Sequence, residues 1–388
     1  MTATPAWPID PVDPYPDLAA LAAQAPLHYL EPLGAWLVLS YELAHQVLRG
    51  EGWSSNPAAS PAVAKRLGLG SGSSHLVGRS VLFADGADHQ RLRQALSGLL
   101  TPRAVAGFRH RIASVVDAAF GALEPTGAWE LMDELAYAVP LGVICELLDT
   151  GVELAVSLRE ETPVMTALLD PLATPTEIEK AEAAAVRLTM DVMALVAERV
   201  GQPDDDLLSQ VASELETQET LVMALLLLAA GHETTASLIG SAAVVLHDQP
   251  GLTDALRKDP GLIPIALEEL LRYEPPVQVT ARITTARQRL GGVVLEPGTQ
   301  LFVSLAGANR DAAVYRDPAR FDLNRDGPPH LSFGHGPHFC AGAALARAEA
   351  CEVITRLLTL DPVLESRDLV IKRAASGTFR RFETLLVA

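Results

Sequence analysis

A cysteine in a glycine-rich run near the C-terminus is the residue with the most clearly defined chemistry. Cys340 follows Phe333-Gly334-His335-Gly336-Pro337-His338-Phe339 and precedes Gly342, and a helical pattern begins near Ala343. A sulfur at a helix N-terminus meets unpaired N–H groups and the positive end of the helix dipole, which favour the thiolate. Glycines let the backbone turn tightly and approach a flat ligand closely. Together these residues indicate thiolate ligation of a haem iron.

Two other interpretations of this run are a buried free thiol and a zinc site. An isolated cysteine is often a buried free thiol, but the flanking glycines and Phe333 argue against that here. Zinc is conceivable because His335, His338 and Cys340 lie close together and His89 could add a fourth ligand. Zinc sites usually contain closely paired ligands such as two cysteines separated by two residues, and no such pair is present. A zinc hydrolase is therefore disfavoured.

A second group of polar residues interrupts the most apolar part of the sequence. Ala230-Gly231-His232-Glu233-Thr234-Thr235 lies in the middle of a helix expected from about Thr217 to His247. An unpartnered polar group in an apolar interior costs roughly 2–7 kcal/mol, and a threonine hydroxyl can bond a carbonyl one turn back and bend the helix. We expect a locally disrupted helix, which is typical of a functional site. A water-filled polar kink is the simpler alternative.

Both groups resemble motifs of the cytochrome P450 family. The order Phe-Gly-x-Gly-x-His-x-Cys-x-Gly is similar to its haem-binding loop, and the run at 230–234 is similar to its oxygen-activation motif. The resemblance implies that Cys340 is the axial ligand of haem b, with Phe333 and Gly342 beside the cofactor. It also implies that Glu233 and Thr234 relay protons and that Gly231 leaves space for O₂ and substrate.

The resemblance assigns four more residues to the haem carboxylates. His89 and Arg93 are four positions apart and share one helix face. They match a propionate-binding pair of the family. Arg282 and His338 match two further propionate ligands. Read without the resemblance, His89 and Arg93 would be a solvated basic turn.

An ion pair between Glu269 and Arg272, three residues apart on one helix face, is also expected. In the family this pair is structural and binds an arginine located before the cysteine loop. Arg320 is the expected partner here, and Arg325 is the alternative.

The whole chain is mainly α-helical with small β-sheets in this interpretation. We expect a hairpin from Leu27–Leu30 and Ala35–Ser40, a helix beginning at Thr174-Pro175-Thr176-Glu177, and strands at Arg289–Val294 and Gln300–Leu305. The 388 residues would form a single cytochrome P450 domain, residues 1–388, with the haem between the long central helix and the helix after the cysteine loop.

Composition limits the partners and the compartment. A net charge of −18 disfavours nucleic acid and anionic membranes as partners. Three cysteines without a paired spacing indicate no disulfide framework, so we expect a cytoplasmic protein. The most apolar run, Leu221 to Gly231, is shorter than the roughly 20 residues of a membrane span. A monomer is expected.

The family resemblance implies a monooxygenase that inserts one oxygen atom of O₂ into a small lipophilic molecule, by hydroxylation or epoxidation, with secondary metabolism as the expected setting. Ring coupling or desaturation by the same machinery remains open. A peroxygenase and a non-catalytic haem-binding recruitment module are disfavoured because Glu233 and Thr234 are both present.

Electrons are expected from a separate ferredoxin or flavodoxin with its reductase. Such donors are usually acidic, so Arg91 and Arg347 are candidates for a basic docking face. Met165, Val277 and Val279 are candidates for an apolar substrate pocket, although each could equally serve ordinary core or lid packing.

Overall fold

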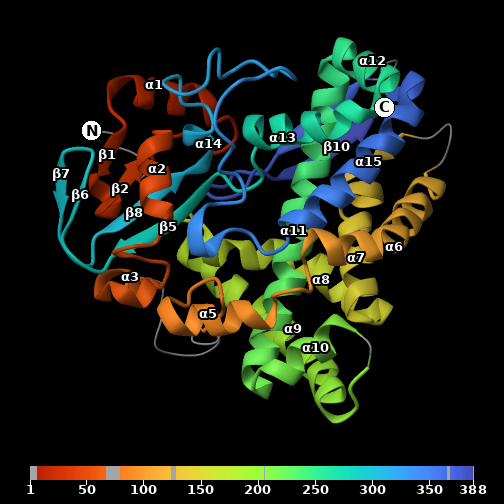
Figure 1. Ribbon diagram of the computed structural model, residues 1–388, viewed down its shortest axis with the longest axis horizontal. Helices are drawn as coiled ribbons and strands as arrows, with labels where there is room; N and C mark the ends of the chain where they lie inside the picture. The colour runs from red at the N-terminus through yellow and green to blue at the C-terminus, as the bar shows by residue number, and fades with distance from the viewer. Residues whose placement is uncertain (1–6, 67–78, 124–127, 205, 365–367, 388) are drawn as a thin grey trace.

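The computed structural model describes residues 7–66, 79–123, 128–204, 206–364 and 368–387. A sheet-containing part and a helical part lie side by side, with most strands at one end of the molecule and most long helices at the other (Figure 1). The described chain is mainly helical with small sheets, which confirms the predicted fold class.

The α-helices vary from one turn to more than eight turns. In chain order they are α1 (Tyr15–Gln24), α2 (Tyr41–Leu48), α3 (Pro61–Arg66), α5 (Gly86–Ala95), α6 (Pro102–Gly121), α7 (Ala138–Leu148), α8 (Val152–Met165), α9 (Pro175–Gly201), α10 (Leu207–Glu214), α11 (Thr217–Asp248), α12 (Pro250–Lys258), α13 (Ile263–Tyr273), α14 (Leu305–Ala308) and α15 (Ala343–Leu364).

The strands form a five-stranded sheet in the order β1-β2-β8-β5-β3, a three-stranded sheet in the order β4-β10-β9, and the hairpin β6-β7. Their bounds are β1 (Leu27–Leu30), β2 (Ala35–Val38), β3 (Trp53–Ser54), β4 (Trp129–Glu130), β5 (Val279–Thr284), β6 (Gln288–Leu290), β7 (Val293–Leu295), β8 (Gln300–Ser304), β9 (Leu369–Arg373) and β10 (Phe382–Val387). Two short helical turns matter below: η4 (Thr166–Leu169) and η6 (Gly336–His338).

The predicted hairpin and the predicted helix start are both confirmed. Strands β1 and β2 pair antiparallel with Leu30 opposite Ala35, and Gly34 ends the connection at φ +59°. Helix α9 begins with a capping box in which Thr174 and Glu177 exchange hydrogen bonds, with Pro175 in the first turn. These signals are local, so the sequence alone could predict them.

The prediction of one strand over Arg289–Val294 is wrong. Gly291 and Gly292 both adopt positive φ, +54° and +82°, and turn the chain back on itself. The segment is therefore the hairpin β6-β7, which pairs with itself rather than with β8. Strand β8 instead pairs parallel with β2 and antiparallel with β5, and this arrangement encloses β8 within the sheet.

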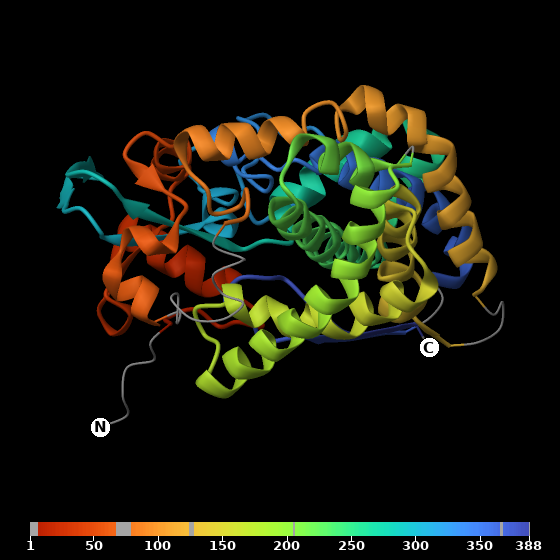
Figure 2. The ribbon, with the colours of Figure 1, turned by 90° about the horizontal axis from the view of Figure 1, so that it is seen from below.

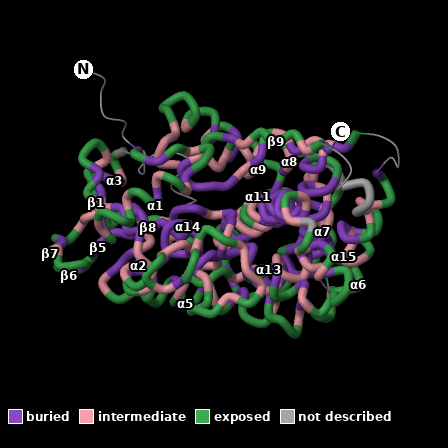
Figure 3. Tube along the Cα trace, turned by 90° about the horizontal axis from the view of Figure 1, so that it is seen from above, coloured by how far each residue is buried: buried purple, intermediate pink, exposed green. Residues whose placement is uncertain are grey.

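Helix α11 is the central helix of the helical part (Figure 3). It runs without interruption over 32 residues, so the predicted local disruption at Gly231–Thr235 is wrong. By length and composition α11 could cross a membrane: an 18-residue window has a mean hydropathy of 1.5, and 61% of it is buried by the rest of the protein. The predicted helix from about Thr217 to His247 is therefore confirmed in its length, although the most apolar run within it, Leu221 to Gly231, is shorter than a membrane span. Its burial by α7, α9 and α15 explains the apolar composition.

Candidate active site

The cysteine loop is folded tightly against α2. The N–H of Cys340 donates to the carbonyl of Phe333 at 2.8 Å and closes the loop. Gly336 has φ +73°, and a Cβ there would lie 2.5 Å from the carbonyl oxygen of Leu48. Gly334 also has positive φ, +72°. The loop therefore needs glycine at these two positions for backbone reasons.

Gly342 has a different role. A Cβ added at this position would meet no protein atom within 4 Å, and its φ is not in the left-handed region. Neither the protein packing nor the backbone conformation requires glycine here. The absence of a side chain is consistent with close approach of something other than the described chain.

Cys340 is a free thiol that solvent can reach. Although solvent can reach the sulfur, the surrounding protein atoms remove much of its hydration. Burial raises the pKa of the Cys340 thiol, and this outweighs the backbone hydrogen bond from Gly342 and the positive charges of Arg93 and Arg347. In the protein by itself, burial thus opposes the preference for the thiolate that is expected at a helix N-terminus.

Phe333 lies beside the same loop. Its ring packs 6.2 Å from that of Phe339, and the Arg347 guanidinium lies 4.4 Å from the Phe333 centroid. Arg347 also binds both carboxylate oxygens of Glu268, at 2.6 and 2.9 Å. Phe333 is thus fixed between the loop and α15.

Helix α11 exposes a short stripe in the middle of its length. Leu227, Ala230 and Thr234 fall on one face at intervals of three and four residues, and all three are accessible. Met223 and Leu238, further along that face, are buried. Accessible residues in the centre of a core helix mark the place where α11 faces a space rather than a neighbouring element.

The threonines bond within α11. The hydroxyl of Thr234 donates to the carbonyl of Ala230 and that of Thr235 to the carbonyl of Gly231, both at 3.1 Å. These bonds back to the preceding turn were predicted, but they leave the helix continuous. A Cβ on Gly231 would point toward Ile144 of α7, at 3.5 Å, rather than along the accessible stripe.

The carboxylate of Glu233 is buried, and its contacts are with residues outside α11. Its Oε1 accepts a hydrogen bond from the hydroxyl of Tyr137 at 3.2 Å and lies 3.2 Å from Nε of Arg381. Its Oε2 is buried without a hydrogen-bond partner among the described residues. Burial raises the pKa of Glu233, although the charge of Arg381 opposes the shift. Tyr137 and Arg381 were not predicted, because no motif in the sequence links them to Glu233.

The four predicted propionate ligands come together from three segments. The His89 and His338 rings are 4.2 Å apart, and the charges of Arg93 and Arg282 both act on His89. Burial and these positive neighbours lower the pKa of His89 to about 4, and its Nε2 is buried without a partner in the described part of the chain. Burial also lowers the pKa of Arg282 to about 10.

Asp85 is a member of this cluster that sequence reasoning missed. Its carboxylate accepts hydrogen bonds from the side chain of Ser54 and the N–H of Ser55, and lies 3.9 Å from His338. Burial opposes the charge, but these bonds prevail and hold its pKa at about 2. The sequence could have identified Asp85 from its position directly before α5, four positions before His89. Across the described residues it is the one carboxylate that forms an ion pair with any of the four predicted ligands.

The histidines of the loop do not converge on one point with Cys340. The ring of His335 stacks on His45, 3.9 Å away, whereas His338 faces His89. In the described ranges no three His, Cys, Asp and Glu side chains are grouped to hold a metal ion by themselves.

The Glu269–Arg272 pair is buried and bidentate, with both nitrogen–oxygen distances at 2.7 Å. Its third member is Arg325, whose Nε lies 2.8 Å from Glu269 Oε1. The preference for Arg320 is therefore wrong: that side chain is exposed, and only its carbonyl accepts a bond from Arg272. A turn closed between Arg325 and Asp322 brings Arg325 back to Glu269.

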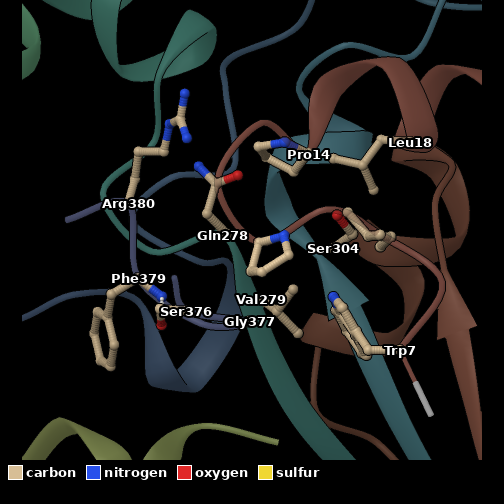
Figure 4. Close-up of a pocket in the computed structure, with 12 residues that line it drawn as sticks. Trp7, Pro14, Leu18, Gln278, Val279, Ser304, Ser376, Gly377, Phe379 and Arg380 are labelled. Atoms are coloured by element: carbon tan, nitrogen blue, oxygen red, sulfur yellow. Dashed lines mark hydrogen bonds between the residues drawn. The ribbon is translucent and has the colours of Figure 1, made fainter. Parts of the chain in front are cut away.

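The three predicted substrate contacts lie in different surroundings. Val279 is buried in a cluster with Trp7 and Phe302 and lines a small pocket beside the N-terminal segment (Figure 4). Packing is therefore the role that the structure shows for Val279. Val277 is partly buried and forms a β-bridge to Phe379. Met165 is partly buried at the end of α8, against the main core.

Comparison with known proteins agrees with this geometry. A model of the family described as Cytochrome P450 matches residues 261–360, which contain α13 and the cysteine loop. Cytochrome P450 107B1 of Saccharopolyspora erythraea is 38% identical over 343 residues, covering 86% of this chain and 83% of the relative. The cytochrome P450 monooxygenase PikC of Streptomyces venezuelae is 35% identical, covering 91% and 85%.

Solved structures agree over nearly the whole length. The structure of P450BioI in complex with hexadec-9Z-enoic acid ligated acyl carrier protein matches with a TM-score of 0.89 at 30% identity, covering 97% of this chain and 98% of that one. From the motifs, the assembled side chains and these relatives, we conclude that the chain belongs to the cytochrome P450 family and is an oxidoreductase of its monooxygenase class.

Proposed function

We propose that the protein is a haem-thiolate monooxygenase that holds haem b between the accessible stripe of α11 and the Cys340 loop. The observation that carries this proposal is the cluster of His89, Arg93, Arg282 and His338. Among the described residues it has one carboxylate, Asp85, for four cations or hydrogen-bond donors. Two haem propionates would supply the missing negative charge and the missing hydrogen-bond acceptors.

The residues present fit this cofactor. Cys340 has an accessible sulfur that would bind the haem iron, and Gly342 has no side chain that would obstruct a flat ring beside it. Phe333 is held rigidly next to the loop. When bound, a thiolate-ligated haem supplies activation of O₂ and transfer of one oxygen atom.

Two side chains of α11 would deliver protons to the reacting centre. Thr234 carries its hydroxyl on the accessible stripe, where it can hold a water molecule or a proton next to the reacting centre. Glu233 is buried and its pKa is raised by that burial, which suits a group that holds a proton before passing it on. Its carboxylate must turn away from Tyr137 and Arg381 to reach Thr234.

The substrate class is a small lipophilic molecule that undergoes hydroxylation or epoxidation. Relatives include 6-deoxyerythronolide B hydroxylase and vitamin D(3) 25-hydroxylase, whose names describe hydroxylation. These support the reaction type and a place in secondary metabolism. They differ too much from one another to support a single substrate.

We also propose a domain organisation, a compartment and an electron donor for the enzyme. We take residues 1–388 as one domain and the protein as a cytoplasmic monomer. Its electrons would come from a ferredoxin or flavodoxin with its reductase. Arg91 and Arg347 do not suit this contact, since Glu219 and Glu268 neutralise them.

The carbon monoxide spectrum of the reduced protein tests the cofactor assignment. Wild-type protein should show the red-shifted band of a thiolate-ligated haem, and Cys340→Ser should lose it. Cys351→Ser is the matched control, because this second thiol of the same region packs against the core and should keep the band. Absence of the band in the wild type would contradict the proposal.

Product yield per electron tests the proton relay. Thr234→Ala should consume NADPH through ferredoxin and reductase but release less product, since protons would no longer reach the reacting centre in order. Unchanged coupling in this variant would show that Thr234 has no such role.

A further inference from the structure

Glu233 is held by two residues from elements distant in the sequence. Tyr137 lies just before α7, and Arg381 lies just before β10. Both contact the same oxygen, Oε1, each at 3.2 Å. The side chain of Glu233 is 2% exposed and that of Arg381 is 22% exposed, so Arg381 connects a fully buried carboxylate to the edge of the protein.

Arg381 also binds the segment in which α8 ends. Its Nη1 donates to the carbonyl of Pro163 at 3.0 Å and to the hydroxyl of Thr166 at 2.6 Å. The Thr166 hydroxyl in turn donates to the carbonyl of Pro163. We call residues Pro163–Asp170 the α8–η4 corner. One guanidinium therefore bridges this corner and the acid of α11.

The loop that carries Arg381 is attached to the same corner at a second point. Ser376 and Gly377 donate to the carboxylate of Asp170, and Thr378 donates to the carbonyl of Leu169 at 2.8 Å. These bonds tie the loop to the corner, so we expect a displacement of the corner to displace Arg381 as well.

The preceding residue, Arg380, faces the opposite side of the chain. It donates to Glu274 at 2.8 Å and to the carbonyl of Val12, and it lines the pocket next to the N-terminal segment (Figure 4). Neighbouring residues of extended backbone point to opposite sides. The anchor at Arg380 therefore fixes the direction in which Arg381 points.

We propose that Arg381 is a positioning residue that couples the orientation of the Glu233 carboxylate to the position of the α8–η4 corner, with Tyr137 as the second group that holds the carboxylate. With the corner in the position described here, the carboxylate is retained on the side of Tyr137. Displacement of the corner withdraws the guanidinium and frees the carboxylate to turn toward Thr234. This inference rests on the proposed role of Glu233 in proton delivery.

Coupling of this kind is reciprocal, so it can be measured from either end. If Arg381 transmits the position of the corner to Glu233, then a change at Glu233 must alter the stability of the corner. Hydrogen exchange of the amides between Val164 and Asp170 reports that stability without any need for turnover.

The first experiment compares exchange in the haem-loaded full-length protein. Glu233→Gln and Arg381→Gln should each speed exchange of the corner by roughly fivefold or more, the lower end of ordinary coupling. Thr234→Val, one position further along α11, should leave it unchanged. An effect of Arg381→Gln without any effect of Glu233→Gln would overturn the proposal.

The second experiment separates positioning from simple packing. Arg187 binds Glu161 of α8 at 2.6 and 2.7 Å and does not contact Glu233, so Arg187→Gln loosens α8 as a matched control. Arg381→Gln should raise kcat and lower the solvent deuterium isotope effect on product formation, because the carboxylate is then free to turn toward Thr234, and KM for the substrate should stay unchanged. Arg381→Lys should reverse part of this change, because it keeps a cation beside Glu233 but lacks the planar fork.

An equal fall of the isotope effect in Arg187→Gln would show that only loosening of α8 matters, which would also overturn the proposal. The two proposals fail in different ways. Loss of the thiolate band in the wild type would remove the monooxygenase assignment and leave the exchange result interpretable. A normal band with an unaltered corner in Glu233→Gln would remove only the coupling.

Discussion

The buried group formed by Glu269, Arg272 and Arg325 joins α13 to the segment that precedes the cysteine loop. Arg272 is 2% exposed, and it also donates to the carbonyls of Asn309, Pro318 and Arg320. Removing one member of such a group leaves buried charge without a partner.

We therefore expect Arg325→Met to lower the free energy of unfolding by about 3–5 kcal/mol. Arg320→Met should change it by less than about 0.5 kcal/mol, because that side chain is exposed. Urea denaturation of the two variants beside the wild type measures the difference. Equal losses would mean that Arg320 shares the ion pair.

Glu349 of α15 is a second buried acid, unrelated to the proposed chemistry. It is 1% exposed, its Oε2 has no partner among the described residues, and burial raises its pKa to about 8. The folded protein therefore retains a proton that the unfolded chain loses near pH 4.5. Below pH 4.5 the contribution of this proton to the free energy of unfolding is fully present. That contribution is lost as the pH rises from 4.5 to about 8.

Glu349→Gln should consequently gain stability relative to the wild type as the pH rises from about 5 to 8. Thermal unfolding at pH 5, 6.5 and 8 measures this trend. Glu352→Gln serves as the control: it removes ion pairs with Arg109 and Arg356 and should lower Tm at each pH. A difference between Glu349→Gln and the wild type that does not vary with pH would contradict the raised pKa.

The element that presents Cys340 can be tested through its glycines. Gly336→Ala would force a Cβ against the carbonyl of Leu48 and require positive φ from alanine, and we expect a loss of about 1–3 kcal/mol in the protein without cofactor. Gly342→Ala meets no protein atom within 4 Å, so stability without cofactor should be unchanged while haem affinity falls.

Denaturation of the cofactor-free variants and haem titration together distinguish the two roles. If Gly342→Ala binds haem as the wild type does, no flat ligand lies against this glycine. If Gly336→Ala is as stable as the wild type, α2 does not support the loop as the structure describes.

Elements with local signals could be predicted from the sequence, and those defined by distant partners could not. The start of α9 depends on Thr174 and Glu177, three residues apart, and α15 begins where Gly342 ends the loop. Strand β5 was not predicted, because β3 is distant in sequence and the β6-β7 hairpin lies between β5 and its other neighbour, β8. The same limit applies within the site: the motif identified Glu233, but not the direction of its carboxylate, which Tyr137 and Arg381 determine.

The strongly acidic molecule needs a local cationic surface to attract an acidic electron donor. Arg49, at the end of α2, is exposed and has no carboxylate partner in the part of the chain that the structure describes. Its charge acts on His335, which belongs to the cysteine loop. It is therefore better placed for that contact than Arg91 or Arg347.

Arg49→Glu should raise the KM for a reduced ferredoxin and weaken the salt dependence of its association, with little change in kcat. Arg91→Gln is the control, since that arginine is already paired with Glu219 at 2.5 and 2.9 Å. Stopped-flow reduction at two ionic strengths measures both variants. A salt dependence equal to that of the wild type in Arg49→Glu would place the donor elsewhere.

The sheet that supports the cysteine loop is assembled from the two ends of the chain. Strand β2 pairs with β8, so that a red segment and a blue-green segment of the chain lie side by side (Figure 2). The N–H of Tyr41 donates to Asp311, 270 residues later. Contacts this remote form slowly, because a long loop must close first. During synthesis the β1-β2 hairpin leaves the ribosome long before its partner strand exists. Productive loading of the cofactor therefore has to wait for an almost complete chain, and a truncated translation product would carry the helices of the site without its ligand.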